Sequence, residues 1–192
     1  MCYISPAAAK ELLGAGATFP YPLYSKMFEA YNNKGVRINY QAIGSGGGIR
    51  QFTNKTVDFG GTDAFMSDAK LKELSSVVHI TTRLGAVSVT YNLPAMPELQ
   101  FSPDVLSDIF LGKIEKWNDP RMQEINSGVK LPDMDIVVVH RSDGSGTTFI
   151  FTDYLAKVSS DWKEKVGRGK SVNYTTSVQW IKLKRLSNCS GR

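Results

Sequence analysis

Segments with the periodicity of strands alternate along this chain with segments that have the periodicity of helices. Residues 36–43 alternate apolar and polar side chains, whereas residues 20–32 place Leu23, Met27 and Tyr31 at helical spacing. This alternation is typical of α/β proteins, in which helices connect the strands of a largely parallel sheet. The sequence also predicts helices at 49–54, 68–75 and 147–157, a helix that opens at 102–104, strands at 57–60 and 136–139, and extended chain over 77–91.

Two hydroxyl residues stand where helices should begin. Thr18 is expected to cap the first helix, with Pro20 in the first turn, and Ser67 is expected to cap the helix at 68–75. These caps predict the residues at which the two helices begin.

Three glycine-rich turns also precede predicted helices. They are GAGATFP at 14–20, GSGGG at 44–48 and RSDGSGTT at 141–148. In open α/β sheets ligands bind beyond the carboxyl ends of the strands, where the N–H groups and dipole of a helix N-terminus favour anions. One such turn is more often a plain linker, but three in one chain, one of them with Arg141, favour an anion-binding site.

The positive charge of the chain is concentrated at one end. The formal charge is +5, yet there are 17 Lys and Arg against 18 Asp and Glu through Gly167, so six basic residues from Arg168 onward account for the excess. Nucleic-acid binding would need basic and aromatic residues interleaved on the body of the protein. We therefore expect no nucleic-acid partner, and we predict a loosely ordered basic tail from Lys170.

The sequence gives little support for an enzyme, a metal-binding protein or a membrane-spanning protein. His79 and His140 are the only histidines, and neither belongs to a serine–base–carboxylate arrangement or a cluster with metal-ligand spacing. The GRGKS stretch at 167–171 resembles the end of a P-loop, but Glu164 stands where that motif needs its first glycine. No apolar run approaches about 18 residues. We expect a binding protein rather than an enzyme, without metal or cofactor.

Asp63 is an unusual residue to find beside turns that favour anions. A carboxylate just past a short strand is usually a helix cap or a turn residue. In an anion site it would repel a fully deprotonated ligand but accept a hydrogen bond from a ligand that carries a proton. Phosphate carries such a proton at neutral pH and sulfate does not, so Asp63 is predicted to be a filter for phosphate.

Five motifs together resemble the phosphate-binding proteins of Pst-type ABC phosphate importers, within the periplasmic-binding-protein family. They occur in the family order over about residues 12–167, and they are GAGATFP, YQAIGSGGG, VDFGGTDA, FLGKIEKWND and RSDGSGTTF. The resemblance implies an α/β fold of two lobes with a mostly parallel sheet, joined by hinge strands. Many relatives have two serines where this chain has Ser45 and Gly46, but the first hydroxyl is kept.

The resemblance also implies which residues bind the ligand. It implies that Asp63 accepts the phosphate proton, that Arg141 supplies positive charge, and that Asp143 orients Arg141. The implied phosphate ligands are Thr18, Phe19 through its backbone, Ser45, Asp63, Arg141, Ser145, Gly146 and Thr147.

The likeness to the family ends near Gly169. We expect a first α/β lobe over residues 1–84, the start of a second lobe over 85–169 and an atypical basic tail over 170–192. A truncation or frameshift would leave the first lobe without its closing segment and the second lobe incomplete.

The implied function is capture of inorganic phosphate between two lobes and its delivery to the membrane permease of an ABC importer. The resemblance implies a monomer in the periplasm or another extracytoplasmic space, although no signal peptide is visible in the sequence. Two alternatives stay open. One is a binder of another oxyanion such as sulfate or molybdate, against which Asp63 argues. The other is a phosphate-handling enzyme such as a phosphatase, which would need a nucleophile with a base or a metal.

Overall fold

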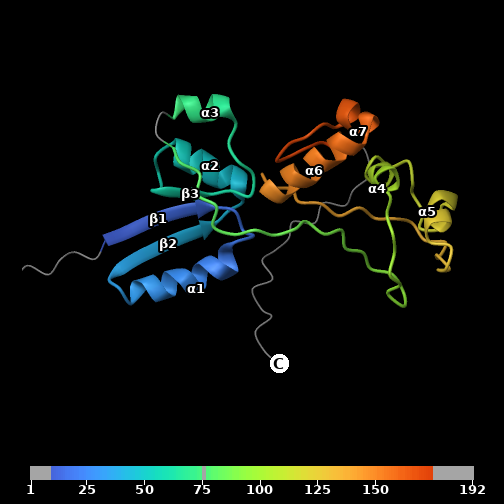
Figure 1. Cartoon of the computed structure of the whole chain (residues 1–192), viewed down its shortest axis with the longest axis horizontal. Helices are drawn as coiled ribbons and strands as arrows, with labels where there is room; N and C mark the ends of the chain where they lie inside the picture. The colour runs from blue at the N-terminus through green and yellow to red at the C-terminus, as the bar shows by residue number, and fades with distance from the viewer. Residues whose placement is uncertain (1–9, 75–76, 175–192) are drawn as a thin grey trace, which may run out of the picture. The chain divides into compact units, whose positions relative to one another are not determined.

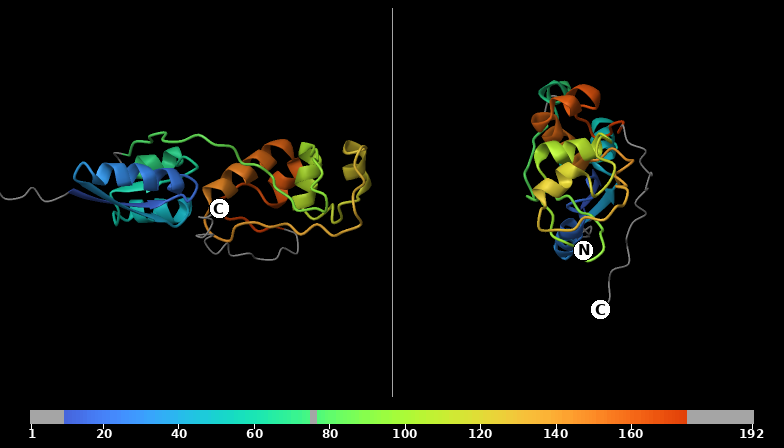
Figure 2. Two further views of the ribbon diagram at one scale, coloured as in Figure 1. Left: turned by 90° about the horizontal axis from the view of Figure 1, so that it is seen from below. Right: turned by 90° about the vertical axis from the view of Figure 1, so that its right-hand side faces the viewer.

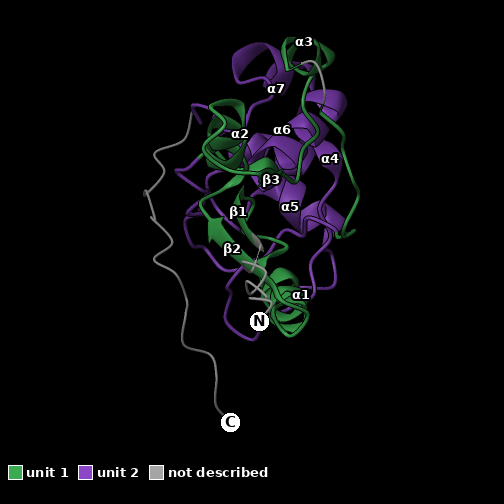
Figure 3. Cartoon of the chain, turned by 90° about the vertical axis from the view of Figure 1, so that its left-hand side faces the viewer, with its two compact units in different colours: residues 1–85, 144–146 green, residues 86–143, 147–192 purple. Residues whose placement is uncertain are grey.

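The computed structural model describes residues 10–74 and 77–174, and the chain forms two compact units (Figure 3). The first unit extends to Gly85 and includes Gly144–Gly146. The second consists of Ala86–Asp143 and the chain from Thr147 onward. The first unit contains a sheet, whereas the described part of the second is built from helices and irregular chain (Figure 1).

The sheet of the first unit has three parallel strands in the order β2-β1-β3. Strand β1 (Lys10–Gly16) pairs with β2 (Val36–Ala42) along its whole length and with β3 (Phe59–Gly61) at its last three residues. Helix α1 (Tyr21–Asn32) connects β1 to β2, and α2 (Ser45–Thr53) connects β2 to β3 on the opposite side of the sheet (Figure 1). The expected α/β fold with a parallel sheet is thereby confirmed.

The central strand β1 is an element that the sequence pattern does not predict. Its two glycines have low strand propensity, but the packing around them leaves no room for side chains. A Cβ on Gly14 would lie 2.2 Å from Cζ of Phe59, and a Cβ on Gly16 would lie 2.0 Å from the carbonyl oxygen of Gly61. Close approach of the neighbouring strand therefore requires glycine at both positions.

Helix α2 begins at Ser45, four residues before the predicted start at residue 49. The glycines 46–48 belong to its first turn rather than to a linker in front of it. A Cβ on Gly48 would lie 2.4 Å from Cα of Gly16 and 2.6 Å from the carbonyl oxygen of Ala15. The glycines let the helix approach β1 closely, which offsets their low helix propensity.

An aromatic cluster packs α1 against the sheet. The ring of Tyr40 on β2 lies 5.4 Å from Tyr24, 6.2 Å from Phe28 and 6.0 Å from Phe59, measured between ring centroids. The Tyr40 hydroxyl donates to the carbonyl oxygen of Ala17 at 2.9 Å. This bond ties the loop after β1 to the core, and burial raises the pKa of the Tyr40 hydroxyl above its usual value.

The predicted helix caps have different outcomes. Thr18 does not cap α1, because Pro20 occupies the N-cap position and no side chain bonds there; the amide of Tyr21 donates to the backbone carbonyl of Thr18 instead. Ser67 caps α3 (Asp68–Glu73), as predicted, by accepting from the amide of Lys70.

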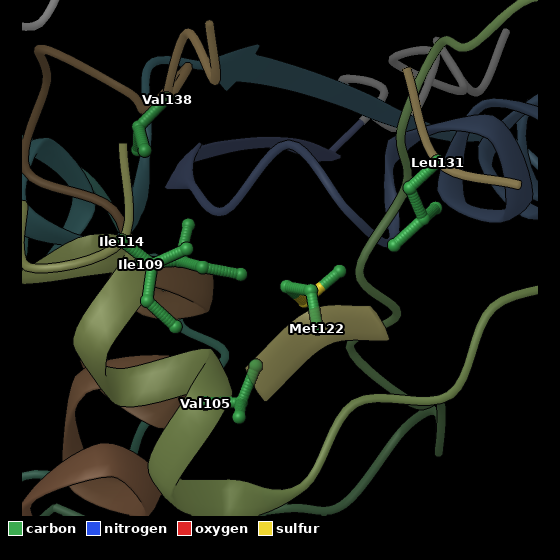
Figure 4. Close-up of a cluster of buried hydrophobic side chains, with 6 residues drawn as sticks. All are labelled: Val105, Ile109, Ile114, Met122, Leu131 and Val138. Carbon is green, nitrogen blue, oxygen red and sulfur yellow. The ribbon is translucent and has the colours of Figure 1, made fainter. Parts of the chain in front are cut away.

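The described residues of the second unit include α4 (Pro103–Phe110), α5 (Pro120–Ile125), α7 (Ser160–Lys165) and all of α6 (Gly146–Val158) except its first residue. Helix α4 contributes to two apolar clusters. One, shown in Figure 4, consists of Val105, Ile109, Ile114, Met122, Leu131 and Val138. The other consists of Leu106, Leu111, Leu155 and Trp162.

The predicted strand at 136–139 does not form. The nearest pairing is a single bridge between Lys116 and Asp135, and Val137 and Val139 are exposed while Val138 is buried. The chain over 77–91 also has no regular secondary structure (Figure 2). A strand needs a neighbour to satisfy its backbone groups, and within the described ranges neither segment belongs to a sheet.

The chain after α7 packs on the second unit as far as Tyr174. The indole N–H of Trp162 donates to the carbonyl of Gly167 at 2.8 Å, and the amide of Gly169 donates to the hydroxyl of Thr152 at 3.1 Å. The Tyr174 ring stacks 4.1 Å from His140. The expectation of a loose tail from Lys170 therefore fails for residues 170–174, because Tyr174 finds aromatic partners, and residues 175–192 lie outside the described ranges.

None of the helices in the described ranges combines the length and the apolar character that crossing a bilayer would require.

Candidate anion-binding site

Three of the predicted binding residues follow the three parallel strands of the first unit. Thr18 comes just after β1, Ser45 just after β2 and Asp63 just after β3. Because the carboxyl ends of parallel strands meet at one edge of a sheet, these residues share that edge. Phe19 lies in the same turn as Thr18, ahead of α1.

Ser45, Asp63 and Gly146 are in contact within the first unit. Ser45 is 1% exposed, and its hydroxyl accepts a hydrogen bond from the backbone N–H of Asp63 at 3.1 Å. A Cβ on Gly146 would lie 2.4 Å from Oγ of Ser45 and 2.7 Å from Cβ of Asp63. The first residue of α2 and the first residue of α6 therefore lie beside the same carboxylate-bearing turn.

Two glycines bring the backbone of these turns together. The N–H of Gly46 donates to the carbonyl of Gly144 at 2.7 Å, and a Cβ on Gly46 would lie 3.1 Å from Cα of Gly144. Larger side chains at these positions would push apart the turns that carry Ser45 and Ser145. Ser145 itself is fully buried.

This arrangement is chemically suited to an anion that carries a proton. The N-terminal end of α2 offers helical N–H groups and the positive end of the helix dipole, and Ser45 adds a hydroxyl. Asp63 places a carboxylate beside them, which is favourable only when the bound species donates a hydrogen bond to it.

Arg141, Asp143 and Thr147 belong to the second unit. The guanidinium of Arg141 is paired with both carboxylate oxygens of Asp143, at 2.8 Å from Nε and 2.5 Å from Nη2. A fork of this kind fixes the plane of the guanidinium. Thr147, the second residue of α6, is partly buried and borders, with Arg141, a cavity of about 200 Å³ whose other lining residues are mostly apolar.

A larger cavity, of about 430 Å³, lies between α1 and β2. Its lining includes the carboxylates of Glu11 and Glu29 together with Arg37. None of the predicted binding residues borders it, and two carboxylates make it a poor place for an anion.

Sequence reasoning missed a group of residues that contacts Phe19. Arg83 donates to the Phe19 carbonyl, and a Cβ on Gly85 would lie 2.2 Å from Cζ of the Phe19 ring. An isolated glycine in an extended segment is a signal for close approach of another group, so Gly85 could have pointed to this contact. No comparable signal marks Arg83.

In residues 10–74 and 77–174, no three His, Cys, Asp or Glu side chains are grouped in a way that could hold a metal ion.

Comparison with known proteins places the chain in a family. Residues 3–184 match the PBP superfamily domain. A protein of Pasteurella multocida named phosphate-binding protein PstS is 50% identical over 171 residues, which are 88% of this chain and 49% of that protein. A protein of the same name from Methanocaldococcus jannaschii is 46% identical over 171 residues, 84% of this chain and 44% of the relative.

Solved structures show the same fold. An ABC-type phosphate transport receptor from Vibrio cholerae is 16% identical and superimposes with a TM-score of 0.54, covering 90% of this chain and 63% of the receptor. A structure from Clostridium perfringens with bound phosphate is 25% identical, with a TM-score of 0.52, over 71% of this chain and 52% of its own. The chain spans about half the length of the curated relatives it matches. It belongs to the PBP superfamily.

Proposed function

We propose that this chain binds inorganic phosphate by hydrogen bonds and acts as the solute-binding component of an ABC phosphate importer. The observation that carries the proposal is the contact among Ser45, Asp63 and Gly146 at the carboxyl edge of the sheet. It joins a buried hydroxyl, a helix N-terminus and a carboxylate, a combination that favours a protonated oxyanion. Relatives at about 50% identity that are named phosphate-binding proteins support the same ligand.

In this proposal each predicted residue has a defined role. Asp63 accepts the proton of the bound phosphate, and Arg141, held by Asp143, supplies positive charge. The donors are Thr18 and Ser45 through their hydroxyls, Phe19 through its backbone, and Ser145, Gly146 and Thr147 at the start of α6. The proposed domain boundaries are those expected from the sequence, 1–84, 85–169 and 170–192, although residues 170–174 pack on the second unit.

The proposed partner is the membrane permease of the importer, with the binding protein acting as a monomer in an extracytoplasmic space. The relatives are named as binding proteins, which supports a role in capture rather than in catalysis. We propose that the chain has no enzymatic activity.

Isothermal titration calorimetry of the whole chain with phosphate, after exhaustive chelation of metals, tests the proposal. We expect saturable binding that chelation does not alter, and we expect Ser45→Ala to weaken it. Binding that disappears with the chelator and returns with a divalent metal would show that the hydrogen-bonding account is wrong.

A turnover assay separates the binder from the phosphatase alternative. The same preparation is incubated with a chromogenic phosphomonoester, with and without divalent metal. We expect no release of phosphate above the protein-free rate, and release that depends on the protein would favour the enzyme.

A further inference from the structure

Three residues without a predicted role contact the region around Phe19. The guanidinium carbon of Arg83 lies 4.5 Å from the centroid of the Phe19 ring, and Nη1 of Arg83 donates to the Phe19 carbonyl oxygen at 3.2 Å. Thr82 shares a hydrogen bond of 2.7 Å with the hydroxyl of Tyr24 on α1. Gly85 leaves space for the edge of the Phe19 ring. The side chain of Arg83 thus contacts both the ring and the carbonyl oxygen of Phe19.

Arginine is suited to this double contact. Its planar guanidinium can stack on an aromatic face while an N–H at its edge donates to a carbonyl. The ammonium of lysine is a compact point charge and cannot combine the two contacts in the same geometry. The hydrogen bond between Thr82 and Tyr24 ties the segment that carries Arg83 to α1.

Phe19 needs such support because its turn lies between two elements. Hydrogen bonds fix the chain on either side, from the amide of Ala17 to Gly61 and from the amide of Tyr21 to Thr18. The residue itself is 38% exposed and belongs to neither β1 nor α1. A backbone donor contributes more to binding when its direction is fixed before the ligand arrives, because less ordering is needed on binding.

We propose that Arg83 is a positioning residue for the phosphate site, which holds Phe19 so that its backbone N–H faces the bound anion. This inference rests on the proposed function, in which Phe19 is a backbone donor. Arg83 acts through Phe19 and need not touch the ligand. The inference therefore predicts two separate effects, one on the mobility of Phe19 without phosphate and one on phosphate affinity.

The first effect is measured without ligand, by the ¹⁵N relaxation order parameter of the Phe19 amide in the whole ¹⁵N-labelled chain. Arg83→Met keeps the alkyl stem but removes the donor and the charge, so the order parameter at Phe19 should fall. Arg83→Lys should give an intermediate value. Lys34→Met is the matched control, because Lys34 also lies over a tyrosine ring of the first unit, 5.6 Å from the centroid of Tyr31, and it should leave Phe19 unchanged.

The second effect is measured by calorimetric titration with inorganic phosphate, well below the thermal unfolding midpoint of each variant. Arg83→Met should weaken binding about tenfold, which corresponds to roughly 1.4 kcal/mol, whereas Lys34→Met should bind like the wild type. An unchanged affinity in Arg83→Met overturns the inference, and so does an unchanged order parameter at Phe19. A wild-type chain that binds no phosphate overturns the proposed function, while a lower order parameter at Phe19 in Arg83→Met would still support the contact of Arg83 with this turn.

Discussion

Arg141 and Asp143 form an ion pair in which the carboxylate orients the guanidinium. Both oxygens of Asp143 accept hydrogen bonds from the Arg141 guanidinium. The pair fixes the direction of the guanidinium and offsets part of its charge. A guanidinium presents its N–H groups in a rigid planar fork, a geometry that suits a tetrahedral oxyanion.

Arg141→Ala should therefore weaken phosphate binding more than any other single side-chain truncation. A hydrogen bond to a charged group contributes roughly 1.5–3 kcal/mol, which corresponds to a loss of about 10- to 150-fold in affinity. Arg121→Ala is a suitable control, because Arg121 also pairs with a carboxylate of the second unit, Asp108, at 2.7 Å. Equal phosphate affinity in wild type and Arg141→Ala, measured by titration calorimetry, would show that Arg141 does not bind the ligand.

At the scale of elements, the packing of α2 on β1 determines where Ser45 lies. The helix can approach the strand because Gly48 has no side chain, and a Cβ there would lie only 2.4 Å from Cα of Gly16. The hydroxyl of Ser45, three residues earlier in the same helix, is thereby held against the amide of Asp63.

Gly48→Ala should destabilise the first unit. The added Cβ would meet backbone atoms rather than a flexible side chain, and overpacking of this kind costs about 1–3 kcal/mol, partly offset by the higher helix propensity of alanine, worth about 1 kcal/mol. Gly128→Ala is the control, since no atom lies within 4 Å of a Cβ at that position. Urea unfolding should show a lower midpoint for Gly48→Ala alone, and equal midpoints would mean that the helix can shift without cost.

The elements differ in how well their sequences predict them. Helix α4 and the cap at Ser67 follow from local rules, because a hydroxyl before an apolar helical pattern is a local signal. Strand β1 and the start of α2 are not predicted, because their glycines are explained only by neighbours distant in sequence, Phe59 and Gly16. The strand predicted at 136–139 fails for the opposite reason, since beyond the bridge of Lys116 with Asp135 the local apolar pattern has no strand to pair with among the described residues.

Part of the candidate site could be predicted from the sequence, because three of its residues lie in turns that directly follow strands. A parallel sheet brings Thr18, Ser45 and Asp63 to one edge, so their grouping follows from topology. The contact of Gly146 with Ser45 and the contact of Arg83 with Phe19 depend on tertiary packing, which no local pattern encodes. The binding roles of these residues remain predictions.

At the scale of the whole molecule, the second unit includes residues after α7, where the excess of basic side chains predicted a loose tail. Arg168 pairs with Asp153 at 2.9 Å, Lys170 lies over the ring of Phe149, and Tyr174 packs against Trp162. The basic residues just after α7 are therefore anchored to α6 by ion pairing and aromatic contact.

Limited digestion with trypsin should accordingly leave a core that retains Tyr174. Arg168 and Lys170 are potential cleavage sites, but their contacts should slow cutting there. Tyr174→Ala removes the aromatic anchor and should make Lys170 accessible. Mass spectrometry of the wild-type core identifies its end, and a core that ends at Arg168 or Lys170 would contradict the packing of this segment.

At the same scale, the proposed function makes ligand selectivity depend on one carboxylate among anion donors. Asp63 lies beside the hydroxyl of Ser45 and the backbone of Gly146. A deprotonated carboxylate there repels a dianion without a proton and accepts a hydrogen bond from one that carries a proton. Asp63→Asn removes the repulsion, and its amide can donate to sulfate.

Competition titration with sulfate against bound phosphate, in wild type and Asp63→Asn, is the most direct test of this account. We predict that sulfate does not displace phosphate from the wild type, that arsenate does, and that Asp63→Asn discriminates less between phosphate and sulfate. Displacement of phosphate from the wild type by sulfate at comparable concentration would contradict the account, as would a selectivity that Asp63→Asn leaves unchanged.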